Sequence, residues 1–217
     1  MKKRNSFGIF TLVLILSLCG CTQDKIPMSS SSDIQKEQDT LPEAEITPEE
    51  EPFLYGYQNL NEEEKTRYRQ ILAGIENYED SVTVEACSEE EINRVSNLVF
   101  VDHPEIFWLE QQKYSFNQKE NSDVDLLELN LVYNMEKDEI EDTKRQIEAK
   151  AEEWSQELSN YENEYDKIKY VYEFLGKNVL YDSESENNQN IQSVFLNQST
   201  VCMGFAKATQ HLLVRNG

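Results

Sequence analysis

Cys202 is the residue of this sequence whose type and surroundings most clearly suggest covalent chemistry. Thr200 can cap a helix whose first turn contains Cys202, and unpaired N–H groups at that end of a helix favour a thiolate. The same amides can stabilise an oxyanion when the thiolate attacks a carbonyl group. Composition alone would make a lone cysteine a small buried hydrophobic residue, so the choice between the two interpretations depends on the surrounding motif.

A cysteine nucleophile needs a general base, and the sequence offers two histidines, His103 and His211. His211 follows Cys202 by nine residues, which on one continuous helix is a rise of roughly 13.5 Å and about half a turn. His211 therefore cannot reach the thiol. His103 precedes a proline and is expected at a helix end or on the surface, and no acid can be assigned to orient either ring.

The residues after Cys202 predict how its helix packs. Gly204 has no side chain and lets another element or a substrate approach closely. Asn216 and Gly217 are a normal helix stop, after which a strand is expected. The predicted buried face of the helix consists of Phe205, Ala206, Thr209, Leu212 and Leu213.

The segment from Tyr181 to Gly217 resembles the cysteine region of the bacterial transglutaminase-like superfamily, whose domain is related to papain. The resemblance is most specific in the pattern Val-Cys-x-Gly-aromatic-Ala-x-Ala around Cys202, and the upstream segment His-Pro-Glu-Ile-Phe-Trp also resembles such lipoproteins. Two features depart from the family pattern. Gln198 and Thr200 stand where the family usually has a glycine-containing turn, and Phe205 replaces a more common tyrosine. The other matching positions are Tyr181, Leu212, Leu213, Arg215 and Gly217.

This resemblance implies both a fold and a reaction. The fold would be α+β and mostly helical, the N-terminal half of a transglutaminase-like domain. Cys202 would form a thioester with a peptide or amide carbonyl of a peptide or protein substrate, and water or an amine would then take the acyl group. Family members supply a histidine and an acid later in the chain, so the resemblance implies that this sequence is C-terminally truncated at Gly217 and inactive in this form.

The N-terminus has the layout of a secretory signal. Three basic residues at positions 2–4 precede an apolar run from Phe7 to Leu18, which is too short to span a membrane as a helix. The following Leu-Cys-Gly-Cys resembles the bacterial lipobox, in which the last cysteine, here Cys21, receives a diacylglycerol. We therefore expect a secreted lipoprotein anchored to the outer face of the bacterial membrane. The alternative is a soluble secreted protein in which Cys21 is free.

The charge and the cysteine count exclude several classes of function. The sequence carries 20 Lys plus Arg against 42 Asp plus Glu, a net charge of −22. Removal of residues 1–20 takes away three positive charges, which leaves 17 against 42, or −25. Such a chain repels nucleic acid. Only Cys87 and Cys202 remain for the folded part, so neither a disulfide framework nor a metal pattern is expected, although a bridge between these two is conceivable. No cofactor is indicated.

Composition, hydrophobic periodicity and the family resemblance together divide the chain into four regions. A polar loop in the third region separates two predicted strands that form a hairpin, near residues 113–117 and 127–133. The expected helices start after the caps Asn61 and Ser88, cover the face Ile140 to Leu158, and run from Glu164 to Asn178. The last of them has an apolar face at Ile168, Val171, Tyr172 and Leu175. A short turn from Glu105 to Leu109 is expected to put Phe107 and Trp108 into a core. The regions are a signal peptide at 1–20, a disordered acidic tether at 21–52, a helix-rich α+β region at 53–160, and the truncated transglutaminase-like domain at 161–217.

The rival hypothesis is a non-catalytic surface lipoprotein. In that case the helix-rich region binds a wall component or a protein partner, and the cysteine segment is a relic. The residues do not choose between hydrolysis and transfer, and they indicate no oligomeric state.

Overall fold

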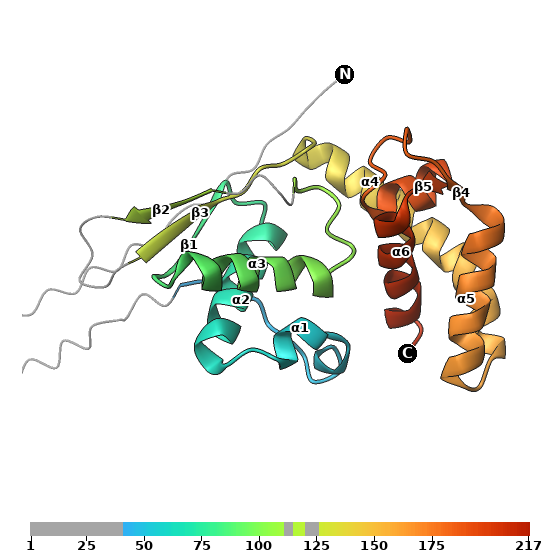
Figure 1. Ribbon diagram of the computed structural model, residues 1–217, viewed down its shortest axis with the longest axis horizontal. Coiled ribbons are helices and arrows are strands. Elements are labelled where there is room, and N and C mark those ends of the chain that lie inside the picture. The colour runs from blue at the N-terminus through green and yellow to red at the C-terminus, as the bar shows by residue number, and fades with distance from the viewer. Residues whose placement is uncertain (1–40, 111–114, 120–125) are drawn as a thin grey trace, which may run out of the picture. The chain divides into compact units, whose positions relative to one another are not determined.

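The computed structural model describes residues 41–110, 115–119 and 126–217. The fold is α+β and mostly helical, with a three-stranded sheet and a two-stranded sheet (Figure 1). The α-helices are α1 (Tyr55–Gln58), α2 (Glu62–Glu76), α3 (Glu89–Asp102), α4 (Lys137–Ser155), α5 (Glu164–Asn178) and α6 (Cys202–Val214). The strands are β1 (Ser81–Glu85), β2 (Ser115–Lys119), β3 (Leu126–Asn130), β4 (Leu180–Tyr181) and β5 (Ser199–Thr200). The shorter turns are η1 (Glu51–Phe53), η2 (Gln156–Asn160) and the π-helical η3 (Ser193–Asn197).

Polar caps fix where three of the longer helices begin. The side chain of Asn61 accepts the N–H of Glu64, and the carboxylate of Glu64 accepts the N–H of Asn61, each at 3.0 Å. Ser88 caps α3 by accepting the N–H of Glu91 at 3.2 Å, and Asn163 caps α5. These contacts satisfy amides that have no partner inside the helix. The helix starts predicted from the caps Asn61 and Ser88 are therefore confirmed, and Asn163 is a cap that was not predicted.

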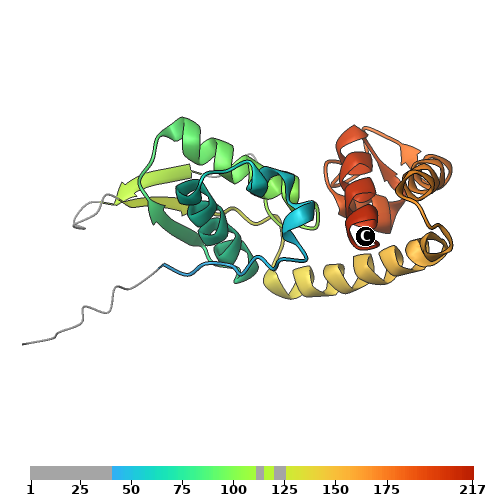
Figure 2. The same cartoon turned by 90° about the horizontal axis from the view of Figure 1, so that it is seen from below.

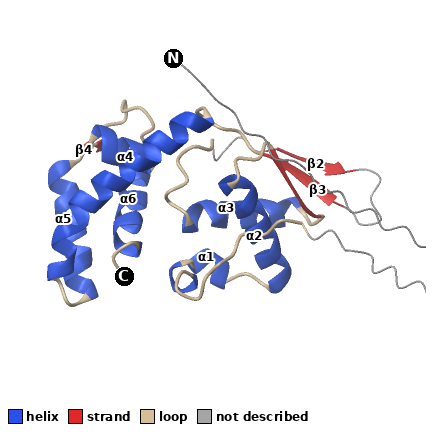
Figure 3. Ribbon diagram, turned by 180° about the vertical axis from the view of Figure 1, so that it is seen from behind, coloured by secondary structure: helices blue, strands red, loops and turns tan. Residues whose placement is uncertain are grey.

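The larger sheet is antiparallel, with the order β1-β3-β2 (Figure 3). The predicted hairpin is present as β2 and β3, and β1 is a third strand that the prediction omitted. Alternate residues of β3, Leu127 and Leu129, are buried, as are Val82 and Val84 on β1. β1 packs against α2, so the core lies between the sheet and the helices.

The turn after α3 places two aromatic side chains in this core. Phe107 is 2 % exposed and Trp108 is 3 % exposed, and their rings meet edge to face at 5.2 Å. This confirms the prediction that the segment after His103 is a short turn that buries both rings. These aromatic residues serve packing.

The long helix α4 packs with the C-terminal elements (Figure 2). The Trp154 ring lies 5.2 Å from the ring of Phe174 on α5 and 5.2 Å from that of Phe195 in η3. The predicted face of this helix is confirmed, because all five of its apolar residues are buried. However, these ring contacts cross the expected domain boundary between residues 160 and 161. The five residues are Ile140, Ile147, Ala151, Trp154 and Leu158.

Two further expectations need correction. Residues 41–52 were expected to be part of a disordered tether, but Ala44 is buried and its N–H donates to the carbonyl of Arg69 at 2.9 Å. Ordered packing therefore begins well before Phe53, because this segment packs against α2.

On α5, Val171 and Leu175 are buried as predicted. Other residues of the expected apolar face are exposed: Ile168 is 50 % and Tyr172 is 77 % exposed.

Candidate functional site

Cys202 is the first residue of α6, and its side chain is exposed as a free thiol. The N-cap residue, Val201, is extended and provides no side-chain hydrogen bond to the helix. The N–H groups of a first helical turn have no acceptor within the helix, and they favour negative charge beside them. The predicted position of Cys202 at a helix N-terminus is therefore confirmed, and the amides there are not used by a side-chain cap.

The predicted cap, Thr200, has a different role. Its side chain is fully buried, and its hydroxyl accepts a hydrogen bond from Ser193 at 2.7 Å and donates to the carbonyl of Asn188 at 2.8 Å. Thr200 thus fixes the loop before α6 to the polar segment at residue 188. The prediction that Thr200 caps the helix was wrong, because its hydroxyl bonds to Ser193 and Asn188 and not to an amide of α6.

Gly204 is where α6 meets this loop. A Cβ at position 204 would lie 1.9 Å from Oγ1 of Thr200 and 3.1 Å from the carbonyl oxygen of Asn188. The expected close approach to Gly204 is confirmed, and the element that approaches is the protein's own loop. Because residue 204 has no side chain, the start of α6 can pack directly against this loop.

Short strands align the cysteine loop with the end of α5. β4 and β5 pair in parallel, with hydrogen bonds of 2.8 Å from the Leu180 N–H to the Gln198 carbonyl and from the Asp182 N–H to the Thr200 carbonyl. Gln198 has φ +52°, a left-handed conformation that glycine adopts at least cost. Gln198 therefore stands in a backbone conformation that a glycine would adopt with less strain.

Apolar side chains lie exposed around this loop. The rings of Tyr181 and Phe205 stack at 6.4 Å with an interplanar angle of 9°. Leu180, Tyr181 and Met203 are 66 %, 64 % and 47 % exposed. Cys202 therefore opens onto a surface that is partly apolar.

The buried face of α6 differs from the prediction. The residues that pack inward recur at helical spacing, but they are displaced around the helix from the predicted set, of which Ala206 is exposed. Burial lowers the pKa of Lys207 to about 8, while Glu105 acts in the opposite direction. Of the predicted residues, Leu212 is buried, and Phe205 and Leu213 are partly buried against the core. The buried residues are Gly204, Lys207, Ala208, His211 and Leu212.

Each histidine contacts a glutamate, and His211 lies nine residues after Cys202 on α6. His211 is on the last turns of α6, as predicted, and its Nε2 atom is 3.2 Å from Oε1 of Glu148, close enough for an ion pair but poorly aligned for a hydrogen bond. Contact with His211 lowers the pKa of Glu148 to about 2; burial opposes this shift and Arg215 adds to it. His211 and Glu148 therefore form a cluster with Arg215.

His103 ends α3, which confirms its expected position at a helix end. Its Nδ1 atom contacts Oε1 of Glu105 at 2.8 Å, and its buried Nε2 atom has no hydrogen-bond partner. Burial lowers the pKa of His103, but the hydrogen bond and charge of Glu105 outweigh burial, so the pKa is raised overall. The same contact lowers the pKa of Glu105 against the effect of burial.

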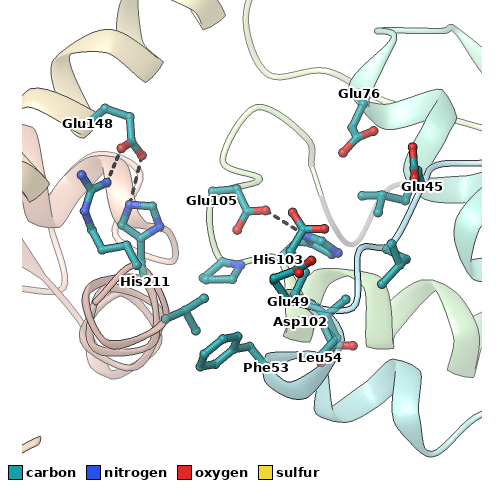
Figure 4. Close-up of a pocket in the computed structure, with 16 residues that line it drawn as sticks. Glu45, Glu49, Phe53, Leu54, Glu76, Asp102, His103, Glu105, Glu148 and His211 are labelled. Carbon is teal, nitrogen blue, oxygen red and sulfur yellow. Dashed lines mark hydrogen bonds and ion pairs between the residues drawn. The ribbon is translucent and has the colours of Figure 1, made fainter. Parts of the chain in front are cut away.

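A cavity of about 430 Å³ lies between these two histidines (Figure 4). It is lined by the segment around Glu45 and Glu49, by Glu76 at the end of α2, by the turn after α3, and by α4 and α6. The sequence does not predict this site. Glu45 and Glu49 fall in the predicted tether, the other acidic residues of the lining are scattered along the chain, and no local motif connects residue 45 with residue 215.

Cys87 is half-buried, and burial raises the pKa of its thiol against the effect of Arg67. Cys21, the predicted lipid attachment residue, lies outside the described residues. Within the described ranges no group of three His, Cys, Asp or Glu residues is placed to hold a metal ion, and no helix is long and apolar enough to cross a membrane.

Comparison with known protein families gives no match for this sequence, and no characterised protein is significantly similar to it. The transglutaminase-like assignment is therefore a prediction that rests on the cysteine motif.

Proposed function

We propose that Cys202 is the nucleophile of an extracytoplasmic transglutaminase-like domain that acts on peptide or amide bonds. The observation that carries the proposal is the exposed thiol at the start of α6, where the helix has no side-chain cap. A first turn without a cap leaves N–H groups that can stabilise both a thiolate and the oxyanion formed when it attacks a carbonyl.

The reaction has two steps. The sulfur of Cys202 attacks the carbonyl carbon, the C–N bond breaks, and the amine leaves with a proton supplied by a general acid. Water or a second amine then attacks the thioester, releases the thiol, and yields an acid or a new amide. His211 does not serve as the base for the first step, because it lies nine residues along α6 from Cys202, a rise of roughly 13.5 Å.

The test uses the protein as its own host produces it. A fluorescent primary amine and a glutamine-containing acceptor protein are supplied, and amine incorporation and ammonia release are measured for wild type, Cys202→Ala and Cys87→Ala. We expect both signals to disappear only in Cys202→Ala, while Cys87→Ala retains them. The ratio of the two signals distinguishes transfer from hydrolysis. Activity that survives Cys202→Ala would contradict the proposal and favour the non-catalytic lipoprotein.

We also propose that Cys21 carries the lipid that anchors the protein to the outer face of the membrane. The support is the order of the basic residues, the apolar run and the lipobox at residues 2–21. Cells fed an alkyne-labelled fatty acid should label the wild type and Cys19→Ser, and should not label Cys21→Ser. Equal labelling of the two variants would refute the assignment.

A further inference from the structure

The cavity between His103 and His211 has an apolar floor and an acidic rim. Its volume of about 430 Å³ is in the range of sites that hold small ligands or a few side chains. The apolar floor draws on segments that are far apart in the sequence. It is formed by Ile46, Phe53, Leu54, Leu72, Pro104 and Val214.

The charge around this floor is strongly unbalanced. Seven carboxylates line the cavity, against one arginine and two histidines. Arg215 is already paired with Glu148 and Glu152, and each histidine contacts a glutamate. The positive groups of the lining are therefore already paired with carboxylates. Negative charge remains in excess whatever the protonation state of the two histidines.

Three of the carboxylates have no partner among the described residues. Glu45, Glu49 and Glu76 make no hydrogen bond or ion pair there (Figure 4). In contrast, Asp102 accepts three hydrogen bonds and Glu50 contacts Thr47. The unpaired carboxylates come from two separate segments, the chain before η1 and the end of α2. A cation in the cavity can thus be approached by carboxylates from more than one side.

We propose that this cavity binds a peptide segment in which a lysine or arginine side chain is flanked by apolar side chains. The cationic group meets the unpaired carboxylates, and the flanking side chains cover the apolar floor. A free aliphatic diamine has the same cationic group but lacks the apolar flanks.

This site is independent of the reaction proposed for Cys202. His211, which borders the cavity, and Cys202 are separated by nine residues along α6, a rise of roughly 13.5 Å. The binding can therefore be measured whether or not the cysteine is active, and Cys202→Ala should leave it unchanged.

The experiment is calorimetric titration of the full-length protein with acetyl-Leu-Lys-Leu-amide. The control peptide has norleucine in place of lysine, which keeps the aliphatic stem and removes the ammonium group, and 1,5-diaminopentane tests the cation alone. We expect the lysine peptide to bind more tightly than both, with an affinity that falls as salt is raised, because charges at a partly open site are screened. Equal affinity for the norleucine peptide, equal affinity for the diamine, or no binding up to about 1 mM would each overturn the proposal.

Matched variants locate the binding. Glu49→Gln combined with Glu76→Gln keeps the size of both side chains, and should weaken peptide binding roughly 3- to 10-fold, as expected for two partly exposed ion pairs. Glu162→Gln makes the same chemical change at an exposed position outside the cavity and should leave affinity unchanged. Both glutamates of the double variant are exposed, so the fold should be intact, which a thermal unfolding curve verifies. A double variant that binds like Glu162→Gln would refute the location.

Discussion

Replacing Gly204 by alanine is the most direct test of how the structure positions Cys202. The new Cβ would lie 1.9 Å from Oγ1 and 3.0 Å from Cβ of Thr200, closer than real side chains allow. Thr200 cannot move aside freely, because it is fully buried and its hydroxyl bonds to Ser193 and Asn188. Either α6 shifts away from the loop or these hydrogen bonds break.

The expected magnitude combines three effects. Alanine favours a helix over glycine by about 1 kcal/mol. Against this, forcing extra atoms into a packed site costs about 1–3 kcal/mol, and leaving a buried polar group without its partner costs about 1–3 kcal/mol more. The net expectation is a loss of about 1–5 kcal/mol in the free energy of unfolding for Gly204→Ala.

Gly176 provides the matched control within the same protein. It lies in α5, and a Cβ at that position would meet nothing within 4 Å. Gly176→Ala should therefore gain about 0.5–1 kcal/mol from helix propensity alone. Urea unfolding followed by far-UV circular dichroism measures both variants. If Gly204→Ala is as stable as Gly176→Ala, the contact between α6 and Thr200 is not as described and the reasoning fails.

Three further predictions follow from burial and charge. Iodoacetamide near pH 7.5 should modify Cys202 well before the half-buried Cys87, and mass spectrometry that found the reverse order would contradict the exposure of α6's first residue. Glu148→Gln should cost about 0.5–1 kcal/mol at pH 7, a small effect because the carboxylate is half exposed. Because contact with His211 depresses the pKa of Glu148, its contribution is complete above about pH 4.5 and is lost as the pH falls toward 2, so the two proteins should then unfold alike; a constant difference would refute the shift. Asp102→Asn should cost about 2–4 kcal/mol in urea unfolding, because a buried acceptor of three hydrogen bonds is partly replaced by a donor, and a loss below about 1 kcal/mol would show that these bonds are dispensable.

Local signals in the sequence account for the parts of the fold that were predicted. Asn61, Ser88 and Asn163 satisfy amides within their own first turns, so the starts of α2, α3 and α5 depend on a few adjacent residues. The alternation of Leu127 and Leu129 similarly identifies β3. Such signals require no knowledge of the rest of the chain.

The parts that were not predicted depend on distant partners. Val82 and Val84 alternate as a strand should, but five residues form a stable strand only because β3 pairs with them. The acidic cavity joins residues from 45 to 215, and each glutamate in isolation is indistinguishable from one on a solvated surface. The buried face of α6 was misplaced because Gly204, which has no side chain to count as apolar, is the residue in closest contact with the loop.

The role of Thr200 connects the stability of the loop to the proposed chemistry of Cys202. A threonine one residue before Val201 is close enough to cap the helix, yet its hydroxyl bonds to Ser193 and Asn188. The loop is thereby held in place, while the amides of the first turn are not used by a side-chain cap. A capped N-terminus would be more stable by about 1 kcal/mol, but it would direct those amides to the protein's own oxygen atom. An uncapped helix start costs stability and leaves donors for a substrate, which is the trade-off expected where a helix N-terminus serves a reaction.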